Sequence, residues 1–409
     1  MSEETPIVVT RETLARVARG LPFLLRRLLA IGLAIEAGRL EVALPDGRVL
    51  LFAGKAPGPA ARLAIRDAAF ARRVVFGGEI GFAEAYVDGL WDTPDLAALL
   101  LLFASSRPRE ARIVSEPWPR LLLRRIGHAL RRNTRAGARR NIADHYDLGE
   151  AFYAAWLDRD LTYSSAIFAE GDDLEAAQTR KNRRLAEATR IEPSAHVLEI
   201  GCGWGSFALF AAREIGCRVT ALTISQAQAD VARRRVHEAG LSERIDIRLE
   251  DYRDVAGQFD RIVSIEMLEA VGEAYWERFF RVLHDRLVPG GLAGLQAITI
   301  CDARYPRYRT EIDFIRARVF PGGMLPSDGI LTALPARAGL DTVEDRSYAA
   351  DYARTLAIWR ERVRASGPRL ETLGFDARFR RMWDYYLAYC ETGFATRNTD
   401  VRQMVVRRG

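Results

Sequence analysis

The stretch Val197-Leu-Glu-Ile-Gly-Cys-Gly-Trp-Gly205 decides the fold of this chain. Its apolar start predicts a buried strand, its glycines predict a tight turn, and residues 206–213 continue with the pattern of a helix. Such a strand, turn and helix start let backbone N–H groups approach a nucleotide-like ligand. The last glycine of the dinucleotide fingerprint and the Lys-Ser/Thr of a P-loop are both missing. The acid Glu199 would repel a pyrophosphate and suits the ammonium group of an amino-acid cofactor better.

Further strand-like runs follow at residues 217–223, 245–250 and 259–265, with helical patterns between them. The first of these helices begins at Ser225, which has the spacing of a capping box with Gln228. Strands that alternate with helices predict a parallel, doubly wound sheet, which binds ligands at the carboxyl ends of its strands. Polar residues stand at those ends, which argues against a glycine turn that serves packing alone. We therefore predict the α/β, Rossmann-like fold of a class I S-adenosylmethionine (SAM) methyltransferase.

Composition sets the outer limits of the prediction. With 409 residues, 49% of them hydrophobic, the chain has room for more than one domain. The net charge of +6 comes almost entirely from arginine, because Lys55 and Lys181 are the only lysines, and it is weak evidence for an anionic partner. Four scattered cysteines predict neither a metal site nor a disulfide framework and indicate a reducing cytoplasm. No apolar run approaches the roughly 20 residues that span a bilayer, so we expect any membrane contact to be peripheral.

We predict three parts. Residues 1–106 form a small α+β domain with a helix over 14–37, a hairpin turning at Asp46-Gly47, strand pieces at 61–65 and 72–76, and helices over 81–91 and 96–103. Residues 141–409 form the methyltransferase domain. Beyond the strands already named, it has a helix over 274–287, a fifth strand over 292–300, a helical insertion over 305–319 and a last strand over 401–406. The helical region 352–389 is rich in aromatic residues, which either fill the core or line an apolar tunnel.

Residues 107–140 form a basic linker, with eleven arginines against Glu110 and Glu116. Within it, Leu122, Ile126 and Leu130 share one helical face with arginines on its flanks. Such a helix can lie on anionic lipid, where each basic residue contributes about 1 kcal/mol. The alternative is a linker helix that packs its leucines on the protein core. Nucleic acid is a poorer partner, because the alternation of aromatic and basic residues that stacks on bases is absent.

Motifs in consecutive order resemble the cyclopropane-fatty-acyl-phospholipid synthases and the mycolic-acid cyclopropane synthases. The matching segments are residues 141–149, 163–168, 198–205, 222–228, 251–254, 267–272, 320–323 and 352–359. Residues 84–91 resemble, less specifically, the small lipid-engaging domain of the phospholipid-acting branch.

The resemblance implies transfer of the SAM methyl group to the cis double bond of an unsaturated acyl chain in a membrane phospholipid. A base then removes a proton from the new methyl group and a cyclopropane ring closes. An alkene is a poor nucleophile, so the reaction needs alignment in a dry pocket, and aromatic faces can stabilise the cation. The implied location is cytoplasmic, peripheral at the inner face of the membrane. The partner is unsaturated phospholipid rather than nucleic acid, and a homodimer is left open.

The base implied by the resemblance is bicarbonate. By motif, its ligands fall on Glu269, Tyr352, Ser165, Gln296 and the backbone of Ile298. Ser165 and Gln296 stand where the family has cysteine and histidine. Both can donate hydrogen bonds, but neither titrates near neutral pH, which puts ring closure in more doubt than methyl transfer.

For SAM, the resemblance points to a set that the strand ends support in part. The predicted residues are Tyr163, Ser164, Gly201, Gly203, Thr223, Gln228, Asp251 and Tyr252, together with Glu199 from the pattern of the strand itself.

Three alternatives remain. The same substrate could give a methyl-branched or methylene product if the cation loses its proton differently. The chain could bind SAM at a lipid surface with impaired catalysis. It could also methylate a small polar or nucleic-acid acceptor, although the aromatic region 352–389 and the lipid-like first domain argue against this.

Overall fold

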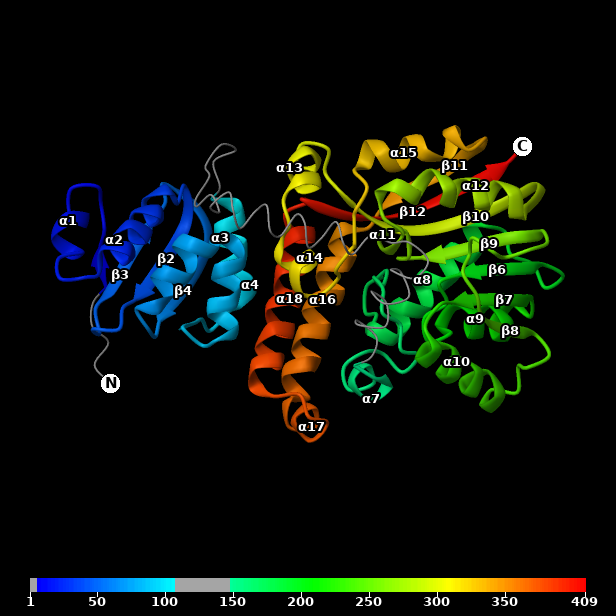
Figure 1. The fold of residues 1–409 in the computed structure, drawn as a ribbon, viewed down its shortest axis with the longest axis horizontal. Coiled ribbons are helices and arrows are strands. Elements are labelled where there is room, and N and C mark those ends of the chain that lie inside the picture. Colours follow the sequence, from blue (N-terminus) through cyan, green and yellow to red (C-terminus); the bar gives the residue numbers. More distant parts are fainter. Residues whose placement is uncertain (1–5, 107–147) are drawn as a thin grey trace. The chain divides into compact units, whose positions relative to one another are not determined.

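A computed structural model describes residues 6–106 and 148–409 (Figure 1). These residues fall into two compact units, each described by itself below. The first unit holds the described residues up to Ser106 together with Gly374–Thr396, and the second holds the remainder. The sequence analysis places Gly374–Thr396 in the methyltransferase domain, so this boundary differs. The predicted basic linker, residues 107–140, lies outside the described residues.

The first unit is a five-stranded sheet with helices, in the strand order β1-β3-β2-β4-β5. The strands are β1 (Ile7–Val8), β2 (Ala37–Ala43), β3 (Val49–Ala53), β4 (Ala56–Ile65) and β5 (Trp91–Asp92). The helices are α1 (Leu14–Val17), α2 (Phe23–Leu29), the 3-10 helix η1 (Ala30–Ala34), α3 (Ala69–Val87), α4 (Leu96–Ser105) and α18 (Ala377–Ala395). The predicted hairpin is confirmed, because β2 and β3 pair antiparallel and Gly47 turns with a φ of 92°.

Two predictions in this unit are wrong. Residues 14–37 are not one helix, because Gly20 adopts a φ of 84° and Pro22 precedes α2. Residues 72–76 are not a strand but part of α3. The β-branched residues there favour a strand locally, but packing decides the outcome, since Val74 is buried on the inner side of the helix.

Helix α18 belongs to the first unit through contacts that span almost the whole chain. The Tyr86 hydroxyl donates to Oδ2 of Asp384 at 2.9 Å, and both side chains are buried. The Arg381 guanidinium lies 3.9 Å from the centre of the Tyr86 ring and donates to the carbonyl oxygens of Tyr86 and Trp91. These contacts are between residues about 300 positions apart, and local periodicity carries no signal for them.

The second unit is a seven-stranded sheet in the order β11-β12-β10-β9-β6-β7-β8. The strands are β6 (His196–Ile200), β7 (Arg218–Thr223), β8 (Ile245–Leu249), β9 (Phe259–Ile265), β10 (Leu287–Ile300), β11 (Leu340–Ser347) and β12 (Thr399–Arg408). The first helices are α7 (Glu150–Tyr153), α8 (Leu174–Ala188), α9 (Ser206–Phe210), the π-helix η2 (Ala211–Ile215), α10 (Gln226–Glu238), α11 (Leu268–Val271) and the 3-10 helix η3 (Glu273–Tyr275). The later helices are α12 (Trp276–Arg286), α13 (Tyr305–Thr310), α14 (Phe314–Arg318), α15 (Asp328–Arg337), α16 (Ala349–Ala365) and α17 (Gly367–Thr372).

The strand directions confirm the predicted doubly wound sheet. Strands β8, β7, β6, β9 and β10 are parallel, and β12 pairs antiparallel with both β10 and β11. Side chains alternate between two apolar cores: Leu198 and Ile200 join one, and Val197 joins the other. The strand order reverses direction between β6 and β9, so the ligand crevice is expected at the carboxyl ends of these two strands.

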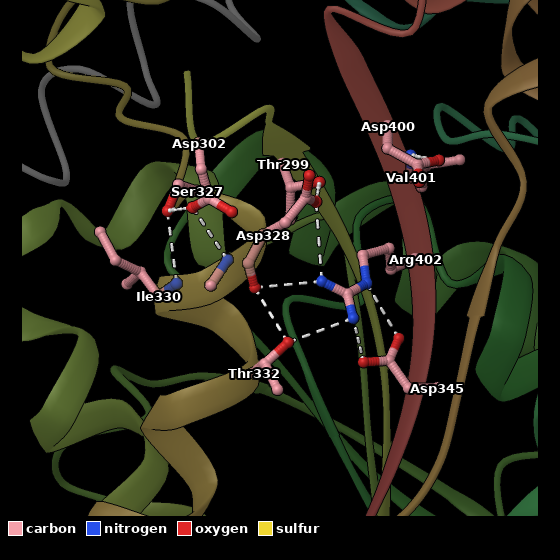
Figure 2. A network of polar contacts seen from close by, with 11 residues as sticks. Thr299, Asp302, Ser327, Asp328, Ile330, Thr332, Asp345, Asp400, Val401 and Arg402 are labelled. Atoms are coloured by element: carbon pink, nitrogen blue, oxygen red, sulfur yellow. Dashed lines mark hydrogen bonds and ion pairs between the residues drawn. The ribbon is translucent and has the colours of Figure 1, made fainter. Parts of the chain in front are cut away.

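A polar network fixes the carboxyl end of β10 (Figure 2). The buried Thr299 hydroxyl donates to Oδ1 of Asp328 at 2.6 Å, which ties the strand to the first turn of α15. Arg402 of β12 donates to the Asp328 carbonyl oxygen at 3.1 Å and forms an ion pair with Asp345 of β11. The network therefore joins α15 to β10, β11 and β12, close to the end of β10 that carries Ile298.

We expect Thr299→Val to lower the free energy of unfolding by about 1–2 kcal/mol, because the isosteric change removes one buried hydrogen bond. The control is Thr342→Val on β11, an exposed threonine that should change the same quantity by less than about 0.5 kcal/mol. Urea denaturation followed by circular dichroism measures both. Equal effects of the two substitutions would show that the network does not stabilise this edge.

Candidate active site

The glycine turn after β6 has the backbone that a close ligand requires. Gly201, Gly203 and Gly205 adopt φ values of 84°, 53° and 86°, and Gly205 is the N-cap of α9. A Cβ atom on Gly203 would meet nothing within 4 Å, so the backbone faces open space there. A Cβ atom on Gly201 would lie 2.6 Å from Cγ of Met267. The turn thus leaves open space beside Gly203, whereas the N–H groups of Gly201 and Cys202 donate to the Leu222 carbonyl oxygen and that of Gly205 donates to Cys202.

Glu199, just before the turn, is buried, and its Oε2 atom has no hydrogen-bond partner among the described residues. Burial raises the pKa of Glu199 to about 8, and the nearby Lys181 charge acts in the opposite direction. A buried acid with one unpartnered oxygen is costly, so it suits a ligand that brings its own cation. The ammonium group of SAM meets that need, and the residues fit the predicted cofactor.

Tyr163 and Ser164 are held from α8 and by aromatic neighbours. The Ser164 carbonyl oxygen accepts from Nε2 of Gln178 at 2.8 Å, and its hydroxyl accepts from Nζ of Lys181 at 3.1 Å. The Tyr163 ring lies 5.6 Å from that of Trp156 and 5.4 Å from that of Trp359. Lys181 is fully buried, and burial lowers its pKa to about 8.

The remaining predicted SAM residues lie at or shortly after the carboxyl ends of β7 and β8. The Thr223 hydroxyl donates to Oε1 of Gln228 at 2.8 Å, and Ser225 caps α10 by accepting from the Gln228 backbone N–H at 3.3 Å. Beyond β8, Arg253 donates to both carboxylate oxygens of Asp251, at 2.8 and 2.5 Å. The Tyr252 hydroxyl is buried without a hydrogen-bond partner among the described residues, and burial raises its pKa to about 12.

The centre of the site is a carboxylate that the sequence analysis does not assign. Glu266 follows β9, and its Oε1 atom accepts from the backbone N–H of Ser165 at 2.7 Å and from Nε2 of Gln296 at 2.8 Å. Its Oε2 atom accepts from the Tyr352 hydroxyl at 2.6 Å. Three of the residues predicted to hold an anion therefore meet at Glu266. Burial raises the pKa of Glu266 in spite of these three donors.

The contact made by Ser165 differs from the prediction. Its hydroxyl donates to the Ala166 carbonyl oxygen at 3.0 Å, so the backbone N–H rather than the side chain holds the carboxylate. This makes the exchange of cysteine for serine less consequential for the anion than the sequence suggests.

Glu269, on α11, is the second acid of the site. Its Oε1 atom accepts from the backbone N–H of Ile298, while its buried Oε2 atom has no hydrogen-bond partner among the described residues. Burial raises the pKa of Glu269 to about 8, and the neighbouring Glu266 charge adds to the effect. Glu266 and Glu269 form a coupled pair that resists carrying two negative charges.

Aromatic rings adjoin this pair. Tyr352, which donates to Glu266, lies 6.2 Å from Trp359 between ring centres, and Trp359 in turn contacts Tyr163 and Trp156. Rings in this arrangement can stabilise a positive charge near the acids.

Among residues 6–106 and 148–409, no helix is both long and apolar enough to cross a membrane. Within the same ranges, no group of three histidine, cysteine, aspartate or glutamate residues is placed to bind a metal ion.

Comparisons with known proteins agree with this geometry. The model of the family described as mycolic acid cyclopropane synthetase matches residues 133–404. Tuberculostearic acid methyltransferase UfaA1 of Mycobacterium tuberculosis is 41% identical over 358 residues, which cover 84% of this chain and 82% of that protein. The cyclopropane-fatty-acyl-phospholipid synthase of Escherichia coli is 33% identical over 362 residues, which cover 87% of this chain and 89% of that protein.

Two solved structures of cyclopropane synthases match about two thirds of the chain. The mycolic acid cyclopropane synthase CmaA1, complexed with SAH and CTAB, gives a TM-score of 0.62 at 27% identity, covering 66% of this chain and 98% of that one. The cyclopropane synthase MmaA2 from Mycobacterium tuberculosis gives 0.61 at 28% identity with the same coverage. Fold and site together define a class I SAM-dependent methyltransferase. The chain belongs to the mycolic acid cyclopropane synthetase family, which includes the cyclopropane-fatty-acyl-phospholipid synthases.

Two residues of the site have no role assigned from the sequence. Glu266 stands at the carboxyl end of a predicted strand, which is a signal, but the family motif directs attention to Glu269 three residues later. Lys181 has a weaker signal: it is one of two lysines in an arginine-rich chain. A compact ammonium group fits beside Ser164 where a planar guanidinium would need more room.

We expect Glu269→Gln to change the pH dependence of stability. The ordinary pKa of this group is 4.5 and its folded value about 8, so between these limits the folded chain holds a proton that the unfolded chain releases. The stability contributed by this group is therefore complete below about pH 4.5 and falls as the pH rises to about 8. The substitution should raise the melting temperature relative to wild type more at pH 8 than at pH 5.

Thermal unfolding across this pH range measures the effect, with the exposed Glu243→Gln as control. A constant difference between Glu269→Gln and wild type at every pH would contradict the raised pKa.

Proposed function

We propose that this protein transfers the methyl group of SAM to a carbon of the cis double bond in an unsaturated acyl chain of a phospholipid. The observation that carries the proposal is the partly buried acid pair Glu266 and Glu269 beside an aromatic cluster, at the strand ends where SAM is expected. When bound, SAM supplies an electrophilic methyl group. An acid pair next to aromatic rings suits a reaction that creates positive charge on an apolar substrate.

The chain's residues supply three functions in this reaction. The glycine turn and Glu199 hold the amino-acid end of the cofactor, which aligns its methyl group with the alkene. The buried rings of Trp156 and Trp359 exclude water and stabilise the cation. The acid pair accepts the proton that leaves the transferred methyl group.

Two products satisfy this chemistry. If the electron pair of the broken C–H bond attacks the cationic carbon, a cyclopropane ring forms, which is the product predicted from sequence. If a hydride first moves between the two former alkene carbons, the same pair forms a methylene group (C=CH₂) on the acyl chain. The 41% identity to a protein named a methyltransferase, against 33% to a named cyclopropane synthase, supports a methyl-branched or methylene product as the second candidate.

The phospholipid substrate has support from the first unit. The alignment with the Escherichia coli phospholipid synthase covers 87% of this chain, whereas the family match covers only residues 133–404, so the likeness extends into the first unit. In that unit, Phe23 is 62% exposed at the start of α2, next to the exposed Arg26 and Arg27. An exposed aromatic ring beside two cations suits an anionic lipid surface at the cytoplasmic side of a membrane.

To test the transfer, the protein is expressed in a bacterium without its own cyclopropane synthase and supplied with methyl-deuterated methionine. We expect acyl chains one carbon longer in composition that retain two of the three deuterium atoms, because one proton leaves the methyl group. Nuclear magnetic resonance separates cyclopropane from methylene products. Retention of all three deuterium atoms would contradict proton loss from the methyl group, and unchanged fatty acids would contradict the transfer itself.

For lipid binding, we expect the double substitution of Arg26→Gln and Arg27→Gln to weaken association with phosphatidylglycerol vesicles by about 2 kcal/mol, as two basic residues leave the surface. Cosedimentation measures the binding. Exposed Arg72 on α3 provides the matched single control, Arg72→Gln. An equal loss per charge for the control would show general electrostatic attraction without a role for α2.

A further inference from the structure

We propose that the Glu266 carboxylate fills the anion pocket for which the family resemblance predicts bicarbonate, and that Glu266 is the base that takes the proton from the transferred methyl group. The inference rests on the proposed function. It concerns how one residue of this chain completes that reaction.

The hydrogen-bond donors of the pocket are already used. Gln296 has two amide N–H groups, and its Nε2 atom donates to Glu266 and to the Ser165 carbonyl oxygen at 3.1 Å. Its amide oxygen accepts from Nε2 of Gln403 at 3.0 Å, which fixes the orientation of the amide. Tyr352 has one O–H and donates it to Glu266. The Ile298 N–H donates to Glu269.

Apart from the acid Glu269, none of the predicted ligands keeps a donor for a bicarbonate ion, because the Gln296 amide, the Tyr352 hydroxyl, the Ile298 N–H and both donors of Ser165 are used. A carboxylate presents the same planar pair of oxygens that bicarbonate would present, so Glu266 satisfies the pocket in its place. The predicted ligand set does not fit a second anion as well.

Charge leads to the same conclusion. A bicarbonate ion would enter beside Glu266 and Glu269, two acids whose pKa values burial already raises. A further negative group at this site would be repelled by whichever of the two acids is ionised. The buried Lys181 is a cation close enough to favour ionised Glu266, so one charge is compensated.

The backbone conformation of Glu266 is independent evidence that its side chain has a function. Its φ of 49° lies in the left-handed region, which costs a residue other than glycine on the order of 1 kcal/mol. The surrounding structure enforces it, because the Glu266 N–H donates to the Gln296 carbonyl oxygen at 2.7 Å. Glycine would be the unstrained residue here, so the carboxylate has a use that offsets the strain.

In the proposed reaction, each bond that forms is matched by a bond that breaks. The π pair of the alkene forms the new carbon–carbon bond as the carbon–sulfur bond of SAM breaks, and the acyl chain keeps one positive charge. Glu266 then takes a proton from the new methyl group. The electron pair of that C–H bond closes the ring, or forms the methylene double bond after the hydride shift. Burial raises the pKa of Glu266, and a carboxylate with a raised pKa is a stronger general base.

The test compares wild type, Glu266→Gln and Glu266→Gly, with Glu243→Gln as the surface control. Turnover of vesicles of unsaturated phosphatidylglycerol is measured in buffer freed of carbon dioxide and in buffer with added bicarbonate. We expect the wild-type and control rates to be equal in both buffers. Glu266→Gln should lose about 100-fold or more in kcat, the range of general-base catalysis, with SAM affinity by calorimetry unchanged.

Glu266→Gly should be inactive without bicarbonate and regain activity when it is added, because the vacated donors can then bind the ion. Glycine also suits the left-handed backbone, so this variant is expected to fold. A wild-type rate that falls without bicarbonate, or full activity of Glu266→Gln, would overturn the inference.

Binding separates this inference from the proposed function. Line broadening of carbon-13 bicarbonate in nuclear magnetic resonance should appear with Glu266→Gly and not with wild type, whether or not either protein turns over lipid. Broadening by wild type that Tyr352→Phe abolishes would place bicarbonate in the pocket and overturn the inference. A wild-type protein that binds SAM, excludes bicarbonate and leaves every unsaturated lipid unchanged would refute the proposed function alone.

Discussion

The hydrogen bonding of the Glu266 carboxylate is the constraint on which the site depends. An acid that is shielded from water must be hydrogen-bonded, and the three donors to Glu266 come from separate parts of the second unit: the loop before α8, strand β10 and helix α16. Each donor reaches the carboxylate only if its own element lies in the correct register. Gln296, for example, pairs with Ile265 across β10 and β9 and with Gln403 across β10 and β12. The Glu266 carboxylate, which follows β9, thus links strand β10 to the loop before α8 and to helix α16.

The parts of the fold that follow local rules could be predicted from the sequence. The run Phe259–Ile265 is β9, and Ser225 caps α10 as its spacing indicates. The predictions were wrong where distant packing overrides local preference, as at residues 72–76, or where a φ above zero breaks a continuous apolar pattern, as at Gly20. Helix α18 joins the first unit through Tyr86 and Asp384, a pairing that no local pattern encodes.

The site shows the same division. Family motifs bring Gln296, Tyr352 and Ser165 to one point, and the structure places them there. What they bind depends on a single side chain, Glu266, which follows β9 with a left-handed φ. The family motif aligns its glutamate with Glu269. It therefore leaves out Glu266, the anion that the chain itself provides. Sequence spacing gives the elements of a site, whereas hydrogen-bond saturation shows which of its donors are free for a ligand.

A base that is part of the protein must lose its proton within the site after each reaction, whereas a dissolved base can be exchanged with solvent. Bicarbonate can leave with its proton, but Glu266 must release the proton within the site before the next methyl transfer. Glu269 meets this need in part, because its Oε2 atom has no hydrogen-bond partner among the described residues and its pKa is raised to about 8. Burial raises the pKa of both acids, and the charge of an ionised Glu266 raises that of Glu269 further, so the pair shares a proton more readily than it carries two negative charges. The strain at Glu266 and the unpartnered oxygen of Glu269 are therefore two parts of one arrangement, which holds a base in place and gives its proton a neighbouring acceptor.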